Sequence, residues 1–185
     1  MRPFLKIDDH IGLHLARPEL AGPVFQTIDE NREHLRQWLP WVDSTRTMED
    51  TKTFIAESMR QNSDGSRLTT FITMDGMVVG SLGVVHFLKD HRRCELGYWL
   101  RQDMQGRGIA TRAASCFIEF LFKNKGQNRL EILVIPENQK SRLVAQRLGF
   151  QSEGVLRQAL LLYGSFRDVE VFSLLKPDWE SREKS

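Results

Sequence analysis

Hydrophobic and polar positions in the first half of the chain predict alternating strands and helices. The pattern predicts a strand at 11–16, a helical region at 18–37, a helix at 48–59 and two strands within 67–88. Pro18 suits the first turn of a helix, whereas Pro40 interrupts the helical region because it disfavours helical geometry at Leu39. The Asp75–Gly76 dipeptide is a strong turn signal, so the strands on either side of it are expected to form an antiparallel hairpin.

The second half is predicted to alternate in the same way. Its expected elements are a strand at 94–100, a helix at 109–123, a strand at 130–135, a helix at 138–148 and closing strands at 155–162 and 169–175. The helix at 109–123 has the clearest helical period, with an apolar stripe of Ile109, Ala113, Cys116, Phe117, Phe120 and Leu121. Because the run at 130–135, LEILVI, is apolar apart from Glu131, we expect a buried strand parallel to 94–100. The pattern predicts a mixed α/β fold in a single domain, 1–185.

Composition adds few constraints to this picture. The chain has 185 residues, and 41% of them are hydrophobic, which suits one soluble domain with a sizeable core. The net charge is only +2, so no whole-chain field favours nucleic acid or a membrane as a partner. Cys94 and Cys116 are the only cysteines, no apolar run reaches transmembrane length and the N-terminus lacks the pattern of a signal peptide. We therefore expect a cytoplasmic protein.

A glycine-rich turn at 105–110 leads from the strand at 94–100 into the next helix. Gly106 and Gly108 let backbone N–H groups approach an anion, and the helix start adds free donors and a positive dipole end. The turn predicts a phosphate-bearing ligand, although two glycines can also serve only to permit a tight turn. A dinucleotide site is the rival interpretation, with Glu131 near the spacing of a ribose ligand, but Glu131 stands at the start of its strand rather than at the end.

The ordered motifs resemble the GNAT acetyltransferase superfamily, in particular its RimL-type branch of ribosomal-protein N-terminal acetyltransferases. The superfamily loop pattern Q/R-x-x-G-x-G/A is matched by Gln105, Gly108 and Ala110. Further matching runs are WLPWV at 38–42, ELGYWL at 95–100, ENQKS at 137–141, RLGF at 147–150 and DVEVFSLL at 168–175. The resemblance implies a GNAT fold over the whole chain, with a mostly antiparallel twisted sheet flanked by helices. It also implies that the sheet splays between its fourth and fifth strands, at 94–100 and 130–135, around acetyl-CoA.

The same resemblance assigns residues to the coenzyme. It places pantetheine against the backbone near Tyr98 and Leu100, the diphosphate at the 105–110 turn, and the thioester beside Asn138 and Ser141. The implied coenzyme-binding residues are Tyr98, Leu100, Gln105, Gly106, Arg107, Gly108, Ile109, Ala110, Asn138 and Ser141. Asn138 and Ser141 also have a structural interpretation, because both residue types are common at helix starts.

Acetyl transfer to an amine needs a neutral nucleophile and a proton for the departing thiolate. Deprotonation of an N-terminal α-amine near neutral pH costs only a few tenths of a kcal/mol, whereas deprotonation of a lysine costs about 4 kcal/mol. A weak base therefore suffices for an N-terminal α-amine. Glu95 is the predicted base, because on a strand it shares a face with Gly97 and Trp99. The alternative is an exposed carboxylate paired with Arg92 or Arg93.

The resemblance to RimL-type enzymes implies that Ser141, one helical turn before Ala145, is the proton donor to the thiolate. Many GNAT enzymes have a tyrosine where this chain has Ala145, so their usual acid is missing here. RimL-type enzymes can carry a glutamate in the segment that matches 158–162, which reads QALLL, so a carboxylate from that strand is unavailable. This second departure favours Glu95 as the base, with His86 in reserve.

Trp38, Trp41 and Trp99 are predicted to contact the acceptor, since aromatic side chains give large apolar contact with few rotamers to lose. Trp38 and Trp41 can equally staple two helices together in the core. No metal is expected, because His10 and His14 are four residues apart in a strand-like segment.

The sequence therefore predicts a metal-free, acetyl-CoA-dependent N-acetyltransferase whose favoured acceptor is the N-terminal α-amine of a ribosomal or other protein. The alternatives are acetylation of a small amine, such as a polyamine, amino sugar or metabolite, a non-catalytic acyl-CoA sensor, and a nucleotide-dependent oxidoreductase. The expected partners are the coenzyme and the acceptor, with no direct nucleic-acid or membrane partner. A homodimer stays open.

Overall fold

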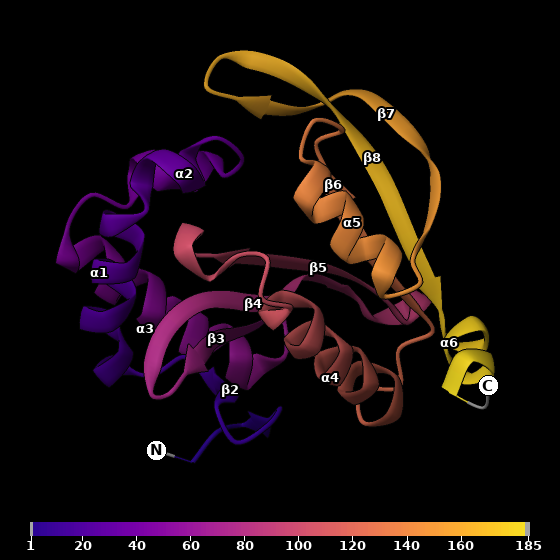
Figure 1. Ribbon diagram of the computed structural model, residues 1–185, viewed down its shortest axis with the longest axis horizontal. Helices are drawn as coiled ribbons and strands as arrows, with labels where there is room; N and C mark the ends of the chain where they lie inside the picture. Colours follow the sequence, from indigo (N-terminus) through magenta and orange to yellow (C-terminus); the bar gives the residue numbers. More distant parts are fainter. Residues whose placement is uncertain (1, 184–185) are drawn as a thin grey trace.

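A computed structural model describes residues 2–183 as an eight-stranded sheet flanked by helices (Figure 1). The strands are β1 (Leu5–Lys6), β2 (Ile11–Leu15), β3 (Leu68–Met74), β4 (Met77–Leu88), β5 (Arg93–Leu100), β6 (Arg129–Val134), β7 (Gln151–Leu162) and β8 (Ser165–Leu175). The helices are α1 (Ala21–Glu30), α2 (Arg32–Arg36), α3 (Met48–Asp64), α4 (Ile109–Lys123), α5 (Gln139–Arg147) and α6 (Lys176–Glu183), and a 3-10 helix, η2 (Pro40–Ser44), follows α2. The strand order is β1-β2-β3-β4-β5-β6-β8-β7.

The sheet is antiparallel except between β5 and β6. Paired residues of these two parallel strands end at Leu96 with Ile132, although β5 continues to Leu100 and β6 to Val134. The backbone groups of the last residues of β5 and β6 therefore do not pair with each other, and the strands diverge. The predicted mixed α/β GNAT fold, mostly antiparallel and opening between these two strands, is confirmed.

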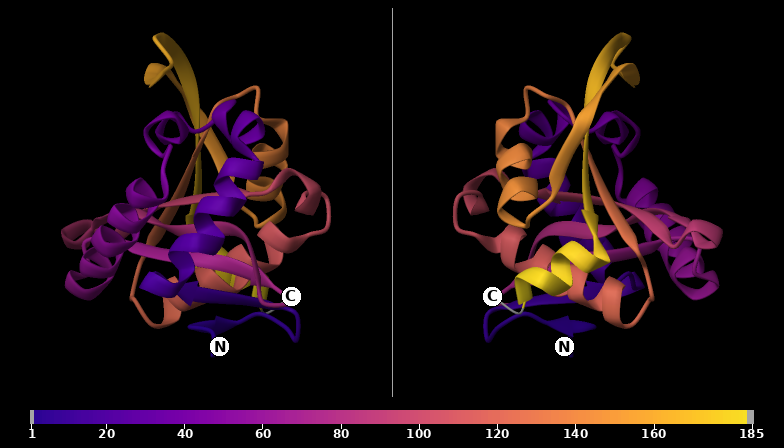
Figure 2. Two further views of the ribbon diagram at one scale, coloured as in Figure 1. Left: turned by 90° about the vertical axis from the view of Figure 1, so that its left-hand side faces the viewer. Right: turned by 90° about the vertical axis from the view of Figure 1, so that its right-hand side faces the viewer.

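Each face of the sheet carries its own hydrophobic core. Leu68 and Ile72 of β3 join the core beneath α4, whereas Phe71 joins the core of the opposite face, with α1 and α3. β5 alternates in the same way, so Leu96 packs in the α4 core and Trp99 packs against the other one. By the same alternation, the Glu95 side chain shares the Trp99 face, and Gly97 is the position between them on that face. In the two side views of Figure 2, the β7–β8 hairpin rises above the rest of the molecule.

Local signals correctly predict the ends of several elements. Asp75 and Gly76 have φ angles of 50° and 82°, as this two-residue hairpin turn requires. Asn138 is the N-cap of α5, because its side-chain oxygen accepts a hydrogen bond from the Ser141 amide at 3.2 Å. Gly149 follows α5 in the left-handed region with a φ of 88°.

Several boundaries differ from the prediction. The helical region at 18–37 is divided at Asn31 into α1 and α2, and α3 continues to Asp64. β7 begins at Gln151 and β8 at Ser165, earlier than predicted, because β7 is exposed along most of its length and two register shifts remove its period-two pattern. The sequence prediction also lacked α6 and the short β1.

The buried face of α4 is wider than the predicted stripe. Cys116 and Phe120 are partly exposed. Residues that are buried although they lie outside the stripe are Ala114, Ile118 and Phe122. The reason is that α4 is covered on more than one side, since the ring of Trp179 in α6 lies 5.2 Å from that of Phe122.

Candidate active site

A large cleft of about 1710 Å³ opens where β5 and β6 diverge. Its walls come from α1, α2 and η2, from the 105–110 turn and α5, and from the β7–β8 hairpin. The predicted site residues that line it are Trp38, Trp41, Glu95, Tyr98, Trp99, Leu100, Gln105, Gly106, Gly108, Ile109, Ala110, Asn138 and Ser141. Arg107 is exposed and lies outside this lining. The fold thus gathers residues from distant parts of the sequence along one cavity.

The glycine turn has the backbone geometry that the sequence predicts. Gly106 and Gly108 have φ angles of 74° and 71°, and Gly108 is the N-cap residue of α4. Gly108 has no side chain to cap the helix, so the first N–H groups of α4 are free to bind a ligand. A Cβ built on either glycine meets no atom within 4 Å, so the space beside the turn is open. Open space next to free N–H groups suits an anion.

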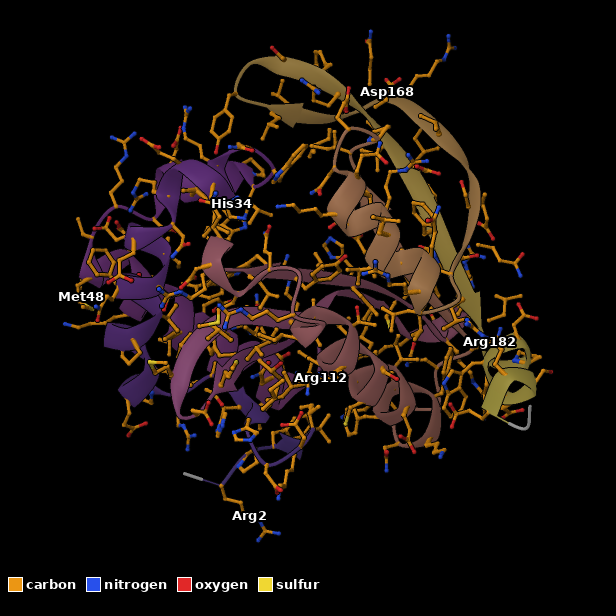
Figure 3. All side chains as sticks on the ribbon, viewed as in Figure 1. Arg2, His34, Met48, Arg112, Asp168 and Arg182 are labelled. Atoms are coloured by element: carbon orange, nitrogen blue, oxygen red, sulfur yellow. The ribbon has the colours of Figure 1, made fainter. Side chains whose placement is uncertain are left out.

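Gln105 connects this turn to both walls of the cleft through His34 and Lys140. Figure 3 labels His34, which belongs to α2. Its Oε1 accepts a hydrogen bond from the Lys140 ammonium at 2.7 Å, so its Nε2 donates to His34 Nε2 at 2.7 Å. Burial lowers the pKa of His34, and the charge of Lys140 lowers it further. His34 and Lys140 both line the cleft, and the sequence prediction missed them because they are 71 and 35 residues from Gln105.

Tyr98 joins β5 to the first turn of α5. Its hydroxyl donates a hydrogen bond to the Ser141 backbone carbonyl at 3.2 Å, and burial raises the pKa of Tyr98 to about 12. The hydroxyl of Ser141 itself makes no hydrogen bond within residues 2–183, although it belongs to a residue that lines the cleft. Ala145 is completely buried behind it. Ser141 is therefore the hydroxyl-bearing residue of α5 that is available to a ligand.

Glu95 is a half-buried carboxylate in the cleft wall. Burial raises its pKa, and the charge of His86 acts in the opposite direction. His86 is the cross-strand partner of Glu95 but is exposed and does not line the cleft. The predicted alternative of an ion pair with Arg93 is wrong, because Arg93 Nε instead donates to Glu131 at 2.7 Å. In the described part of the chain, Glu95 has no hydrogen bond or ion pair.

The carboxylate of Glu131 is buried and paired with two arginines. Its side chain is 5% exposed and accepts hydrogen bonds from Arg93 and Arg129, both at 2.7 Å. A carboxylate held in this way is not available to a ribose, which disfavours the dinucleotide interpretation.

Burial raises the pKa of Cys94 to about 12, so its thiol stays protonated near neutral pH.

The remaining wall is aromatic and apolar. The ring centroids of Trp41 and Trp99 are 6.2 Å apart, and Trp38 lines the same region. Ala159 and Leu160 of β7 face the cleft, so the QALLL segment reaches the cavity but brings no carboxylate. The two other histidines discussed above lie elsewhere: His10 contacts Asp75 and His14 contacts Arg17.

The family described as acetyltransferase (GNAT) domain matches residues 10–151, and the chain belongs to this family. It is 27% identical to the ribosomal-protein-serine acetyltransferase of Escherichia coli (strain K12), over 94% of this chain and 97% of that protein. The microcin C7 self-immunity acetyltransferase MccE, in complex with acetyl-CoA and AMP, superposes with a TM-score of 0.89 at 28% identity, over 92% of this chain and 95% of that one.

The fold is also that of the ribosomal L7/L12 α-N-protein acetyltransferase RimL in complex with coenzyme A. That structure superposes with a TM-score of 0.90 at 23% identity, over 94% of this chain and 98% of that one. Within residues 2–183, none of the helices has the length and apolar character needed to cross a membrane. The chain is thus an acetyltransferase of the GNAT family.

Proposed function

We propose that this chain transfers an acetyl group from acetyl-CoA to an amine, and that the favoured acceptor is the N-terminal α-amine of a ribosomal or other protein. The observation that carries the proposal is one cleft that is lined both by the glycine turn and by Glu95. The complex of MccE with acetyl-CoA supports the choice of coenzyme. The similarity to a ribosomal-protein-serine acetyltransferase over nearly the whole chain supports the choice of acceptor.

The residues of the turn suit the diphosphate of the coenzyme. The turn lies at the positive end of α4, with open space where side chains at Gly106 and Gly108 would stand, and the ammonium of Lys140 is held at the turn by its contact with Gln105. The backbone of β5 beyond Leu96 is unpaired with β6, so its N–H and C=O groups can bind the amides of pantetheine. The coenzyme supplies the acetyl thioester, which this arrangement would hold in the gap between the strands.

Two side chains of this chain suit the proton transfers. Glu95 lies on the Trp99 face of β5, whereas Ser141 contacts Tyr98 on the other face, so the two groups approach the gap from opposite sides. Glu95 would take a proton from the amine, directly or through water, and Gly97 lines the cleft beside it. The Ser141 hydroxyl would give a proton to the departing sulfur.

Replacing Gly108 by alanine is expected to raise the KM for acetyl-CoA about tenfold, which corresponds to about 1.4 kcal/mol. A φ of 71° strains any residue with a Cβ, and the turn will relax by turning its N–H groups away from the ligand. Steady-state kinetics with varied acetyl-CoA measure the effect.

Gly76→Ala is the matched control for this variant. Gly76 also has a positive φ of 82° and open space around it, but it lies in the β3–β4 turn. Both variants should lose about 1 kcal/mol of stability, and only Gly108→Ala should change the KM. Equal KM values in the two variants would contradict a role of the turn in binding the coenzyme.

Replacing Ser141 by alanine is expected to lower kcat about 10²-fold and to leave the KM for acetyl-CoA within about twofold. The substitution removes the hydroxyl but keeps the backbone amide that Asn138 caps and the carbonyl that Tyr98 contacts. Ser115→Ala, on the exposed face of α4, is the control. A normal kcat in Ser141→Ala would remove the acid role.

The acceptor is tested by mass spectrometry of proteins and metabolites incubated with the pure protein and isotope-labelled acetyl-CoA. Label on N-terminal α-amines supports the proposal. Label only on small amines would show that the acceptor is a small molecule and not a protein N-terminus. Binding of coenzyme A without release of its thiol from acetyl-CoA, with any amine, would instead identify a sensor.

A further inference from the structure

The tip of the β7–β8 hairpin makes a contact that the chemistry above does not use. The hairpin ends in a two-residue turn, Tyr163–Gly164, with φ angles of 49° and 79°, and Leu162 pairs with Ser165 on either side of it. Most of the tip is exposed to solvent, as Phe166 is at 64%. Tyr163 is different, because its side chain reaches a segment 124 residues away in the sequence.

One hydrogen bond and one cation–π contact hold Tyr163 against the α2–η2 segment, residues 32–44. Its hydroxyl donates a hydrogen bond to the Leu39 backbone carbonyl at 2.8 Å, and the Arg36 guanidinium lies 4.1 Å from the centre of its ring. Arg36 is held in place by Asp43 of η2 through hydrogen bonds of 2.8 and 2.9 Å. Each contact is exposed and individually weak, so the fastening can open and close at little cost.

These contacts join two walls of the same cleft. Trp38 and Leu39 line it from one side, and Ala159 and Leu160 line it from the hairpin. Figure 1 shows the hairpin arching over the top of the molecule towards α2. Tyr163 is not among the described residues that line the cleft, so its contact with Leu39 bridges the two walls beside the apolar region to which Trp41 and Trp99 belong, and we call this bridge the roof of the cleft.

We propose that Tyr163 is a specificity-determining residue that sets the width of the acceptor entrance by fastening the β7–β8 hairpin to Leu39 and Arg36. The extended N-terminus of an acceptor polypeptide, if its first side chains are small, passes beneath the roof while the Tyr163 contacts are intact. An acceptor with bulky groups next to its amine has to break the Tyr163 contacts first. The inference rests on the proposed transfer to amines and narrows its acceptors to thin, unfolded chain ends.

The test compares two peptide acceptors that differ only in width. One peptide has serine, alanine and glycine as its first three residues, and the other has serine followed by two tryptophans. We expect the wild-type protein to prefer the narrow peptide, and Tyr163→Ala to shift the ratio of the two kcat/KM values at least tenfold towards the wide one. Tyr163→Phe, which keeps the ring but loses the Leu39 hydrogen bond, should give a smaller shift in the same direction.

Phe166→Ala is the matched control, since it also removes an aromatic ring from the hairpin tip, but Phe166 takes part in none of the ring or cation–π contacts found within residues 2–183. It should leave the ratio unchanged. A ratio in Tyr163→Ala within twofold of wild type would overturn the inference and would leave the proposed transfer to amines intact.

Hydrogen exchange measured by mass spectrometry tests the roof without turnover. Tyr163→Ala should speed amide exchange both at 160–166 and at 38–44, whereas Phe166→Ala should not affect 38–44. If the wild-type protein acetylates no amine, the proposed function fails. Amide hydrogen exchange still tests, independently of activity, whether Tyr163 holds the hairpin against residues 38–44. Unchanged exchange at 38–44 in Tyr163→Ala would show that no fastening exists.

Discussion

Replacing Glu95 by glutamine is expected to lower kcat about 10²–10⁴-fold, the usual range for loss of a general base. Glutamine has nearly the same shape but cannot accept the proton of the amine. Glu95 has no ion pair within residues 2–183, so the substitution leaves no charged partner uncompensated and the fold should persist. Initial rates at saturating acetyl-CoA and acceptor measure kcat, and thermal unfolding checks the fold.

The pH dependence identifies the carboxylate. Burial raises the pKa of Glu95 above the usual glutamate range, and a base acts only when deprotonated. In the wild-type protein, kcat should therefore fall as the pH drops through this raised pKa and level off above it. Glu95→Gln should lose this fall. The ionisation of the free α-amine, with a pKa of about 7.7–8.0, affects kcat/KM rather than kcat and is the same for both proteins.

Glu119→Gln is the matched control, because Glu119 lies on the exposed face of α4 and pairs with Lys123. It should keep the wild-type kcat and pH profile. If Glu95→Gln also keeps the wild-type profile, the base is another group or a water molecule, and the role proposed for Glu95 is wrong.

Replacing Phe117 by alanine is expected to lower the free energy of unfolding by about 3–5 kcal/mol. Phe117 is completely buried in the core between α4 and the sheet, so the substitution removes apolar contacts and leaves a cavity. For a chain of this size, each kcal/mol shifts Tm by roughly 2–4 °C, so Tm should fall by about 6–20 °C. Urea unfolding and calorimetry give the two values.

Phe166→Ala again serves as the control, because the same side chain is lost from a position that is 64% exposed. Its free energy of unfolding should stay within about 0.5 kcal/mol of wild type. A loss below about 1 kcal/mol in Phe117→Ala would contradict the packing of α4 described above.

Local signals account for the elements that the sequence predicts well. The Asp75–Gly76 turn, the N-cap Asn138 and the end of α5 at Gly149 each depend on the conformational preferences of one or two residues. The glycine turn at 105–110 is of the same kind, because a positive φ and free N–H groups follow from Gly106 and Gly108 themselves.

The sequence prediction fails where neighbouring elements decide which side chains of a helix or strand are buried. α4 buries Phe122 outside its predicted stripe because Trp179 of α6, a helix that the sequence does not predict, packs against it. β7 lacks alternation because it is an edge strand with most side chains exposed. Glu95 illustrates the same limit, since its freedom from Arg93 depends on Glu131 in the neighbouring strand.

By itself, the sequence predicted the order of most strands and helices and the phosphate-suited turn, because each of these is encoded by residues close together in the chain. Together with the family resemblance, it also proposed Glu95 and Ser141 as candidate base and acid. Only the tertiary structure decided which distant side chains meet. The contact of Gln105 with His34 spans 71 residues and that of Tyr163 with Leu39 spans 124. Such contacts depend on strand order and on where each helix packs, and no periodicity within one element encodes them.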